Sequence, residues 1–596
     1  MPLLKSCLLL SIALPLHAAH WPLDAPGEPG LRLHGETRVI DGVRDRALLL
    51  DGHSSLELAD SATLGSTGDF TFTVWCNPVR LRDVQRMIAA KNRYSRGERE
   101  WGVMVDADGR FRLYVQQKGW QTVTAKTEPV AGRWHLISVV RRDRTMELWV
   151  NGELEGRTDL PQAMPVSAAP ITLGGVLDGV PRQTFAGGLD EARFEPRSLS
   201  ATELAALHQP VTATLPVPEP VHKAVLWNER QPVPKAADLP VLRNVRFSVI
   251  KPYEFRKDRY RFLHGVGLAF HKGRLYASFG HNQGGENTDT EEARFCVSDD
   301  QGHTWSAVQT MDDGGPKVAV SHGVFLSHKG TLWAFMGAYT GTMVGVHTRA
   351  YRLNEATGSF DQLGVVLKGG FWPMQEPIRM NNGNWILAGI SAGGDAPAGG
   401  RHPAAVAISQ GDNLLKWDLV RIPQVADLGT VWGESTVLVE GSRITNLSRY
   451  GAEANALTAT SEDYGRTWTL MRPSNLPMAT SKPYAGILST GQRYLVCSTS
   501  ADGGGRRAPL TIAVSRPGET EFSRVCVIRH ALFPEGPGES HARVSLSYPY
   551  AIEHEGHLYV GYSNNGGNVG RIGEGRELWN NNSAELAVIP LAELAP

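Results

Sequence analysis

The stretch LHGVGLAFHKGRLYASFG, residues Leu263–Gly280, contains a short apolar strand, a glycine turn and a second apolar strand. Five further copies of this pattern follow: SHGVFLSHKGTLWAFMGAY from Ser321, QEPIRMNNGNWILAGIS from Gln375, GESTVLVEGSRITNLSRYG from Gly433, KPYAGILSTGQRYLVCSTS from Lys482 and SYPYAIEHEGHLYVGYSNN from Ser547. Strand repeats of roughly 50 residues are typical of β-propellers, in which each copy supplies one four-stranded blade. The sequence therefore predicts a six-bladed β-propeller over residues 241–596.

One residue leads each copy, at the start of the innermost strand of its blade. These residues are His264, His322, Glu376, Glu434, Lys482 and Tyr548, at successive intervals of 58, 54, 58, 48 and 66 residues. Innermost strands begin near the propeller axis, so we expect the lead side chains to converge on one cleft. A ring with a purely structural function would favour small or apolar residues there. We therefore interpret the polar lead residues as the candidate site.

The same half of the chain contains a second repeated motif. SDDQGHTW (Ser298–Trp305) and SEDYGRTW (Ser461–Trp468) both fit S-x-D-x-G-x-T-W, and a weaker copy is SQGDNLLKW (Ser409–Trp417). In such a turn the Asp side chain accepts hydrogen bonds from backbone N–H groups and the Gly adopts a conformation that other residues avoid. We predict a structural, non-catalytic role for Asp300 and Asp463. The motif resembles the Asp-box of sialidase-type propellers.

The strands that flank the repeats predict how the ring closes. VLRNVRFSVI, residues 241–250, precedes the first copy, and AELAVIPLAEL, residues 584–594, follows the last. We expect the first segment to add an outer strand to the sixth blade, because closure by terminal strands removes exposed sheet edges.

The first half of the chain alternates short apolar strands with Gly, Asp and Asn turns, which predicts an antiparallel sandwich over residues 20–208. ELWVNGELEG contains an Asn151–Gly152 turn, and in GGLDEARFEPRSLSATELAAL Ser200 is expected to cap a short helix with Glu203. These segments resemble laminin-G-like, concanavalin A-like jelly rolls. The fold class predicted for the whole chain is all-β, a jelly-roll sandwich plus a propeller. Domains of the resembled kind bind sugars or protein, or pack against a neighbour, and these alternatives stay open.

Two segments outside the predicted domains differ from them in composition. In residues 1–19 a Lys precedes an apolar run and small residues, which predicts a Sec signal peptide and a secreted or periplasmic protein. Residues 209–240 contain seven prolines and are predicted to form an extended linker. The net charge is -1 and no later run is long enough to span a bilayer. We therefore expect no nucleic-acid partner and no membrane span.

Within residues 242–596 several segments resemble strands of exo-sialidases (neuraminidases), which use a Tyr nucleophile, a Glu base and three Arg that hold the substrate carboxylate. WGESTVLVEGSRITNLSRYG resembles the Glu strand and the second Arg, which implies Glu434 and Arg449. GGRRAPLTIAVS resembles the strand of the third Arg, and Arg507 is favoured over Arg506. SYPYAIEHEGHLYVGYS resembles the tyrosine strand, with Tyr548 as nucleophile.

The remaining site residues follow from the same resemblance and from the lead positions. Tyr550 is the alternative nucleophile, and Arg261 in YRFLHGV is a loose fit to the first Arg, since the proline of the family phrase is missing. His322 stands where the family has its acid Asp, and a histidine can act as acid or base. His264 and Glu376 are predicted to bind substrate.

The function expected from these residues is a retaining exo-glycosidase that acts on sialic acid or a related acidic sugar. Sialidases with a Tyr nucleophile are an exception to the usual carboxylate pair of glycosidases. Three alternatives remain. They are a lyase of uronate polysaccharides that uses Tyr548 with His322 or His264, a protein that binds glycan without cleaving it, and a metal enzyme with His and Glu ligands. The expected partner is an acidic glycan or polysaccharide, and neither a cofactor nor a metal is predicted.

Overall fold

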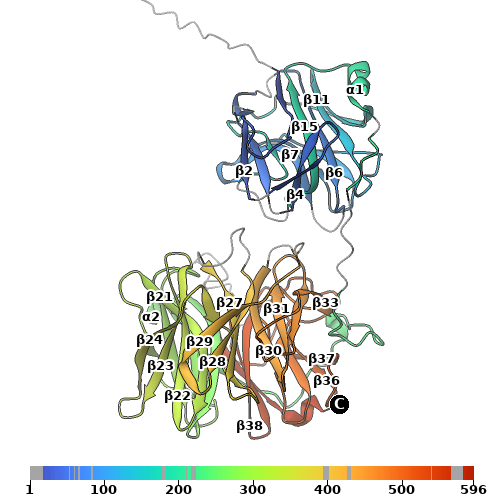
Figure 1. The fold of residues 1–596 in the computed structure, drawn as a ribbon. Helices are drawn as coiled ribbons and strands as arrows, with labels where there is room; N and C mark the ends of the chain where they lie inside the picture. The colour runs from blue at the N-terminus through green and yellow to red at the C-terminus, as the bar shows by residue number, and fades with distance from the viewer. Residues whose placement is uncertain are drawn as a thin grey trace, which may run out of the picture. The chain divides into compact units, whose positions relative to one another are not determined.

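The computed structural model describes residues 18–595 except for 36, 53, 60, 65–67, 82–84, 178–182, 210, 216–222, 394–401, 426–427, 429–430, 539 and 566–581. The chain forms two compact units, residues 1–220 and 221–596 (Figure 1). The predicted signal peptide lies outside the described residues apart from Ala18 and Ala19. No helix in the described part of the chain is long and apolar enough to cross a membrane.

The first unit is a sandwich of two antiparallel sheets. One sheet has the order β13 (Glu153–Asp159), β12 (Thr145–Val150), β11 (His135–Arg142), β6 (Phe70–Pro78), β15 (Ala186–Glu195), β4 (Arg46–Asp51) and β3 (Thr37–Asp41), with β1 (Ala19–Trp21) paired to β15. The other has the order β10 (Trp120–Thr124), β9 (Phe111–Gln116), β8 (Glu98–Val105), β7 (Arg86–Arg93), β14 (Thr172–Leu173), β5 (Ser55–Leu58) and β2 (Leu31–His34).

Local sequence signals set the elements of the sandwich. Buried Phe70, Phe72 and Trp101 form part of a core that both sheets share. Asn151 and Gly152 both have positive φ in the β12–β13 turn, as the sequence predicts. Ser200 caps helix α1 (Ala201–Leu207) in a capping box with Glu203, which confirms the second local prediction. The two sheets place their apolar faces together, which is the jelly-roll sandwich expected from the alternating pattern.

The second unit is the predicted propeller, and its described residues form six sheets. The first two blades are β17 (Phe262–His271), β18 (Arg274–Asn282), β19 (Glu291–Ser298) and β20 (Gln309–Asp312), then β21 (Val318–His328), β22 (Thr331–Thr340), β23 (Val344–Asn354) and β24 (Ser359–Leu367). The third is β25 (Phe371–Pro373) and β26 (Ile378–Arg379) beside β27 (Trp385–Ser391), β28 (Ala404–Gln410) and β29 (Asn413–Arg421).

The other three blades complete the ring. The fourth is β30 (Val431–Glu440), β31 (Arg443–Tyr450), β32 (Asn455–Ser461) and β33 (Arg472–Pro477). The fifth is β34 (Tyr484–Ile487), β35 (Arg493–Cys497), β36 (Leu510–Ser515) and β37 (Phe522–Arg529). The sixth is β38 (Ser545–His554), β39 (His557–Asn565), β40 (Asn582–Pro590) and β16 (Arg246–Lys251).

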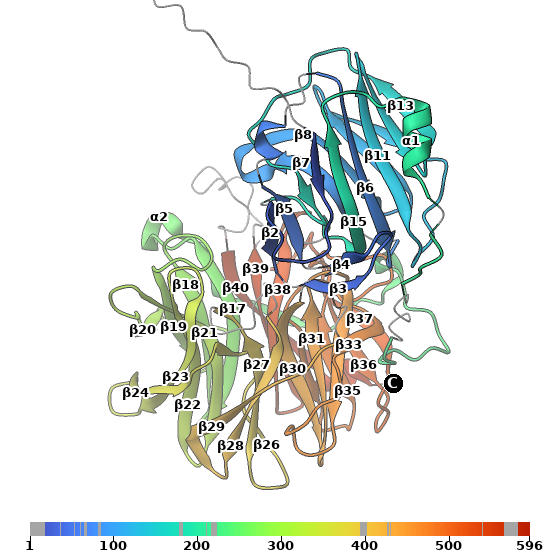
Figure 2. The same cartoon turned by 45° about the horizontal axis from the view of Figure 1, so that its top comes forward.

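The sixth blade closes the ring as predicted. Strand β16 pairs antiparallel with β40, so the segment that precedes the first repeat completes the last blade. The red strands β38 to β40 lie beside the green strand β17, which joins the end of the propeller to its beginning (Figure 2). Because β16 and β40 pair with each other, the backbone groups on their facing edges are hydrogen-bonded and not exposed.

The two S-x-D-x-G-x-T-W turns have equivalent hydrogen bonds. Asp300 Oδ1 accepts from the backbone N–H of Thr304 at 2.8 Å, and Asp300 Oδ2 accepts from the hydroxyl of Thr304 at 2.6 Å. Asp463 accepts from Thr467 in the same way, at 2.8 and 2.7 Å. Both carboxylates are therefore occupied within their own turns.

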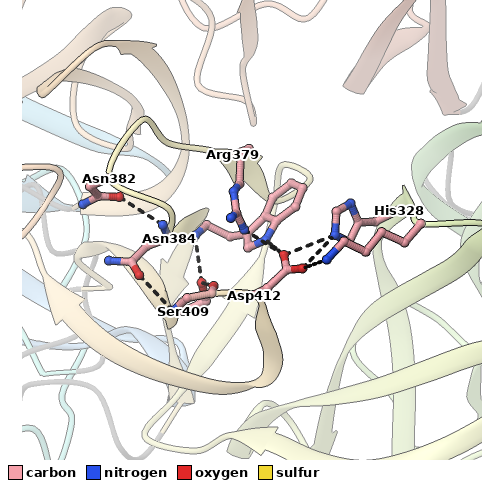
Figure 3. Close-up of polar contacts among 9 residues, drawn as sticks. His328, Arg379, Asn382, Asn384, Ser409 and Asp412 are labelled. Carbon is pink, nitrogen blue, oxygen red and sulfur yellow. Dashed lines mark hydrogen bonds and ion pairs between the residues drawn. The ribbon is translucent and has the colours of Figure 1, made fainter.

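Asp412, in the weaker copy of this motif, has a different environment. Its carboxylate accepts from His328 Nε2 at 3.1 Å, from Arg379 Nη1 at 2.7 Å and from the indole N–H of Trp385 at 2.9 Å (Figure 3). His328 belongs to the second blade and the others to the third. The cluster links two neighbouring blades at the turns between their strands, and we assign it a structural role.

The segment predicted to be a linker makes specific contacts at both of its ends. Leu215 donates its backbone N–H to Gly132 O in the sandwich at 2.9 Å. Trp227 and Leu239 are buried in a cluster with strands of the fourth and fifth blades, and the backbone N–H groups of Leu226 and Trp227 both donate to Asn475 Oδ1. Residues 223–242 therefore belong to the propeller unit, and residues 210 and 216–222 of the predicted linker lie outside the described residues.

Candidate functional site

A pocket of about 250 Å³ lies where the innermost strands of the propeller begin. Six of the eight predicted site residues are among those that line it: His264, His322, Glu434, Arg449, Arg507 and Tyr548. Trp372 and Trp432 supply flat apolar surface beside them. The arrangement combines two cations, a carboxylate and a phenol in one enclosed space.

Irregular strand register places four of these side chains. The pairing of β17 with β18 shifts between His264 and Gly267, and β38 shifts against β39 between Ser547 and Tyr550. The equivalent shifts in β21 and β30 fall at His322 and Glu434. A bulge turns the local side chains away from the regular alternation of a strand, and bulges are frequent beside active sites. Each of these four lead residues therefore points into the pocket from an otherwise regular blade, whereas Lys482, which also leads a copy, does not line it.

Tyr548 has an unusual backbone conformation. Its φ is +52°, in the left-handed region that costs a non-glycine residue roughly 1–2 kcal/mol. Its side chain is buried, and its ring centroid lies 3.6 Å from that of His264 and 5.6 Å from that of His322. Such strain persists only where the surrounding contacts fix it, and it is common at functional sites.

The phenol of Tyr548 forms a hydrogen-bonded unit with an ion pair. Its hydroxyl donates to Glu434 Oε1, and Arg449 Nη1 donates to Glu434 Oε2 at 2.8 Å. Burial and then the charge of Glu434 raise the pKa of Tyr548 well above its usual value, whereas Arg449 and Arg507 lower it. The phenol is therefore protonated at neutral pH, with a carboxylate in position to accept its proton.

The two histidines are neutral and partly unpaired. Burial lowers the pKa of His264 well below its usual value and the pKa of His322 to about 3, and the charge of Lys482 lowers both further. Among the described residues, neither ring nitrogen of His264 has a hydrogen-bond partner, and Nε2 of His322 has none. The structure therefore presents both rings to a ligand as neutral donors or acceptors.

Two predicted site residues lie elsewhere. Glu376 lies between β25 and β26, where Pro377 lacks the N–H that a continuous strand would need. Its Oε2 accepts from the hydroxyl of Tyr484, and Glu376 does not line the pocket. Arg261 stacks on the ring of Phe255 at 4.6 Å and is also absent from the pocket lining. The prediction that these two residues face the pocket is wrong.

The structure shows which of the two candidate tyrosines and which of the two candidate arginines line the pocket. Tyr550 packs on Tyr484, with ring centroids 4.6 Å apart, and does not line the pocket, whereas Tyr548 does. Arg507 lines the pocket, and Arg506 does not. The bulge explains the first result. Strict alternation would place residues 548 and 550 on one face, but the register shift between Ser547 and Tyr550 turns Tyr548 out of the regular pattern that Tyr550 follows.

Sequence reasoning missed two acidic residues of the pocket. Glu286, in the connection between β18 and β19, lies at the rim with much of its surface open to solvent. The protein around its carboxyl and then the charge of Glu434 raise the pKa of Glu286, while Arg507 opposes the increase. Propeller connections between second and third strands lie at the same end as the starts of the first strands. This rule could have indicated from the sequence that Glu286 lies near the pocket.

Glu291 is the second missed carboxyl. It accepts from the hydroxyl of Tyr339 at 2.6 Å and from the hydroxyl of Ser321, which lies 3.2 Å from Nδ1 of His322. Burial raises the pKa of Glu291 to about 7. The carboxyl therefore fixes Ser321 and, through it, the ring of His322. Within the described residues, no group of three His, Cys, Asp or Glu side chains is arranged to hold a metal ion.

Comparison with family models separates the same two units. The concanavalin A-like lectin/glucanases superfamily matches residues 50–205, and the BNR repeat-like domain matches residues 273–560. The chain joins a concanavalin A-like domain to a BNR repeat-like domain. Both β domains expected from the sequence are thereby confirmed. No curated protein sequence gives a significant match.

Solved structures similar to the chain include three sialidases. The NanB sialidase of Streptococcus pneumoniae is 11% identical, with a TM-score of 0.42 over 94% of this chain and 99% of that one. The leech intramolecular trans-sialidase is 11% identical, with a TM-score of 0.42 over 95% and 98%. The Trypanosoma rangeli sialidase is 12% identical, with a TM-score of 0.45 over 59% and 61%. These similarities assign no role to any residue of the BNR repeat-like domain.

Proposed function

We propose that the protein is a secreted or periplasmic retaining exo-glycosidase of the sialidase superfamily. Its substrate would be a glycan that ends in sialic acid or a related acidic sugar. One observation carries the proposal: the hydroxyl of Tyr548 donates to Glu434, whose carboxylate is also bound by Arg449. A phenol in contact with its base, next to two arginines, is a nucleophile suited to an anionic sugar.

Arg449 and Arg507 would bind the carboxylate of the sugar. A guanidinium forms paired hydrogen bonds with a carboxylate, and two of them offset its charge within a partly buried site. An acidic nucleophile would be repelled by that carboxylate, whereas a neutral phenol is not. This difference favours Tyr548 over a glutamate as the attacking group.

In the first step, the phenol oxygen of Tyr548 would attack the anomeric carbon while its proton passes to Glu434. The bond from the anomeric carbon to the leaving oxygen breaks, and Glu286 would donate a proton to that oxygen. In the second step, Glu286 would take a proton from water, whose oxygen attacks the same carbon. The tyrosyl bond then breaks, and the phenol regains its proton from Glu434. Two displacements at one carbon retain its configuration.

Glu286 suits the acid–base role better than His322, the residue favoured by sequence. A pKa of about 3 leaves His322 without a proton to donate at neutral pH, so we assign it a hydrogen bond to substrate. The raised pKa of Glu286 increases the fraction of the carboxyl that is protonated. Its place at the rim suits a group that contacts the leaving oxygen and then water.

A second candidate is a lyase of uronate polysaccharides. It is favoured by one observation, the close contact of neutral His264 with Tyr548, since a neutral imidazole beside a phenol can take a proton from the carbon next to a carboxylate. Arg449 and Arg507 would then offset the charge of the uronate. This reaction would leave a carbon–carbon double bond in one product.

Product analysis on a panel of acidic glycans separates the possibilities. Release of a free acidic sugar whose first-formed anomer, followed by NMR, has the configuration of the substrate is the expected result. Inversion of that configuration would contradict the Tyr548 nucleophile. An unsaturated uronate would instead establish the lyase. Saturable binding without any product would identify a glycan-binding protein.

A further inference from the structure

A second cavity of about 810 Å³ opens beside the first pocket. It is formed by the connection between β35 and β36 and by the segment between β37 and β38. Arg507 lines both cavities, so its side chain lies between them. We call the second cavity the Arg543 cavity, after one of the three arginines that line it.

The Arg543 cavity is lined by positive charge that the described residues do not pair. Arg506, Arg507, Arg543 and His530 line it, and none of the described lining residues is acidic. The described residues form no ion pair with Arg506, Arg507 or Arg543. By contrast, Arg449 pairs with Glu434 in the same domain. These three guanidinium groups are therefore available to an anion.

The hydrogen bonds of Arg506 and Arg507 orient their guanidinium groups without neutralising the charge, because the acceptors are carbonyl oxygens. Arg506 donates to the carbonyl oxygens of Gly503 and Asp502 at 3.2 and 3.0 Å, and Arg507 Nη2 donates to Thr480 O at 3.0 Å. The carboxylate of Asp502 accepts from the backbone N–H of Ala236 at 2.8 Å. Carbonyl acceptors fix a guanidinium and still allow its other N–H groups to bind a carboxylate.

The remaining wall of the cavity is apolar. Pro509, Ala531 and Val544 line it, together with Leu532, which is 61% exposed. An exposed leucine beside three arginines makes a surface that is both apolar and cationic. A sugar acid fits this combination, because its ring presents C–H groups on its faces and a carboxylate at its edge.

We propose that the Arg543 cavity binds a second acidic sugar, the one that immediately precedes the sugar held in the first pocket. This inference rests on the proposed function and deepens it, since it names the preferred substrate as a glycan that ends in two neighbouring acidic sugars. Arg507 lies between the two carboxylates. Arg506 and Arg543 bind the second carboxylate, and Leu532 packs on the ring.

The test compares two substrates that differ in the neighbour of the terminal sugar. These are an α2,8-linked dimer of sialic acid, whose second sugar is acidic, and 3′-sialyllactose, whose second sugar is neutral. We expect kcat/KM to favour the dimer, and the variant R506A/R543A to lose about tenfold on the dimer, since exposed ion pairs contribute up to about 1 kcal/mol each. The loss on sialyllactose should be at least fivefold smaller. Arg472→Ala, at an exposed residue of β33, is the control for the loss of a surface arginine outside the cavity.

Binding of a sialic acid trimer to the full chain, measured by calorimetry, keeps the inference testable without turnover. Tighter binding of the trimer than of the free sugar, lost in R506A/R543A and kept in R472A, would support the second subsite even if no glycan is cleaved. Such binding without cleavage would refute the proposed hydrolase and would leave the second subsite supported. Equal binding of the trimer by R506A/R543A and by the unmodified chain would overturn the inference, as would an equal loss of kcat/KM on both substrates.

Discussion

The ammonium of Lys482 donates a hydrogen bond of 2.7 Å to the carbonyl oxygen of Pro549, the residue that follows the candidate nucleophile. Lys482 is buried, and its Nζ lies 5.4 Å from the ring centre of Tyr484 and 5.8 Å from that of Tyr550. The bond holds the bulge in which Tyr548 has its left-handed backbone. We infer that Lys482 positions Tyr548 without touching the substrate.

Replacing Lys482 with Met should lower kcat about 100-fold with little change in KM, because a small displacement of an attacking group has an effect of this size. Burial lowers the pKa of Lys482 to about 7, and Glu434 and Glu376 oppose the decrease. Between pH 7 and 10.5 the unfolded state therefore binds a proton that the folded state lacks. The contribution of Lys482 to stability rises with pH across that window.

Chemical denaturation at several pH values and steady-state kinetics measure both effects. In Lys482→Met the rise of stability between pH 7 and 10.5 should be smaller than in the unmodified chain. An unchanged kcat would show that the bond to Pro549 does not position the nucleophile.

Tyr548→Phe should reduce turnover by at least about 10³-fold and leave glycan binding and the midpoint of unfolding nearly unchanged, because one hydroxyl is lost and the ring still packs on His264. Glu434→Gln should cause a similar loss. The double variant should be little worse than either single variant, since both residues act in one proton transfer. Additive losses in kcat would mean that they do not act as a unit.

Glu286→Gln should lower kcat/KM by about 10²–10⁴-fold on a natural glycan, whose leaving oxygen needs a proton. The loss should be far smaller on an aryl glycoside, whose phenolate leaves without one. The control Glu462→Gln changes a carboxyl on a turn of the fourth blade, outside the pocket lining. Equal losses on both substrates would assign Glu286 to binding instead of acid catalysis.

Trp227→Ala should destabilise the propeller by about 3–5 kcal/mol, the usual loss for a buried aromatic side chain. Trp227 is 3% exposed and its indole N–H donates to Gln231 O at 2.9 Å. Trp120→Ala, at a residue 39% exposed in the sandwich, serves as the control and should have a small effect. Denaturant unfolding measures both. In limited proteolysis, the segment 223–242 should resist cleavage, and early cuts beside Trp227 would contradict its packing.

Much of the fold could be predicted because its signals are local. The Asn151–Gly152 turn, the Ser200 cap and the copies of the strand–turn–strand pattern depend on residues close together in the chain. Counting the copies predicts six blades, and the flanking strands predict the pairing of β16 with β40. The lead positions also predicted that Tyr548 and Glu434 would converge, since equivalent strands of a propeller begin at one end.

The sequence alone therefore predicts the two β domains, the number of blades and six of the side chains that line the pocket. The folded structure was needed to show that Glu376 accepts a hydrogen bond from Tyr484 and that Arg261 stacks on Phe255. It also brought Glu286 to the rim and Arg543 beside Arg507. Strand patterns repeat every two residues and can be recognised in isolation, whereas the path of a connection depends on contacts with distant blades that no local pattern records.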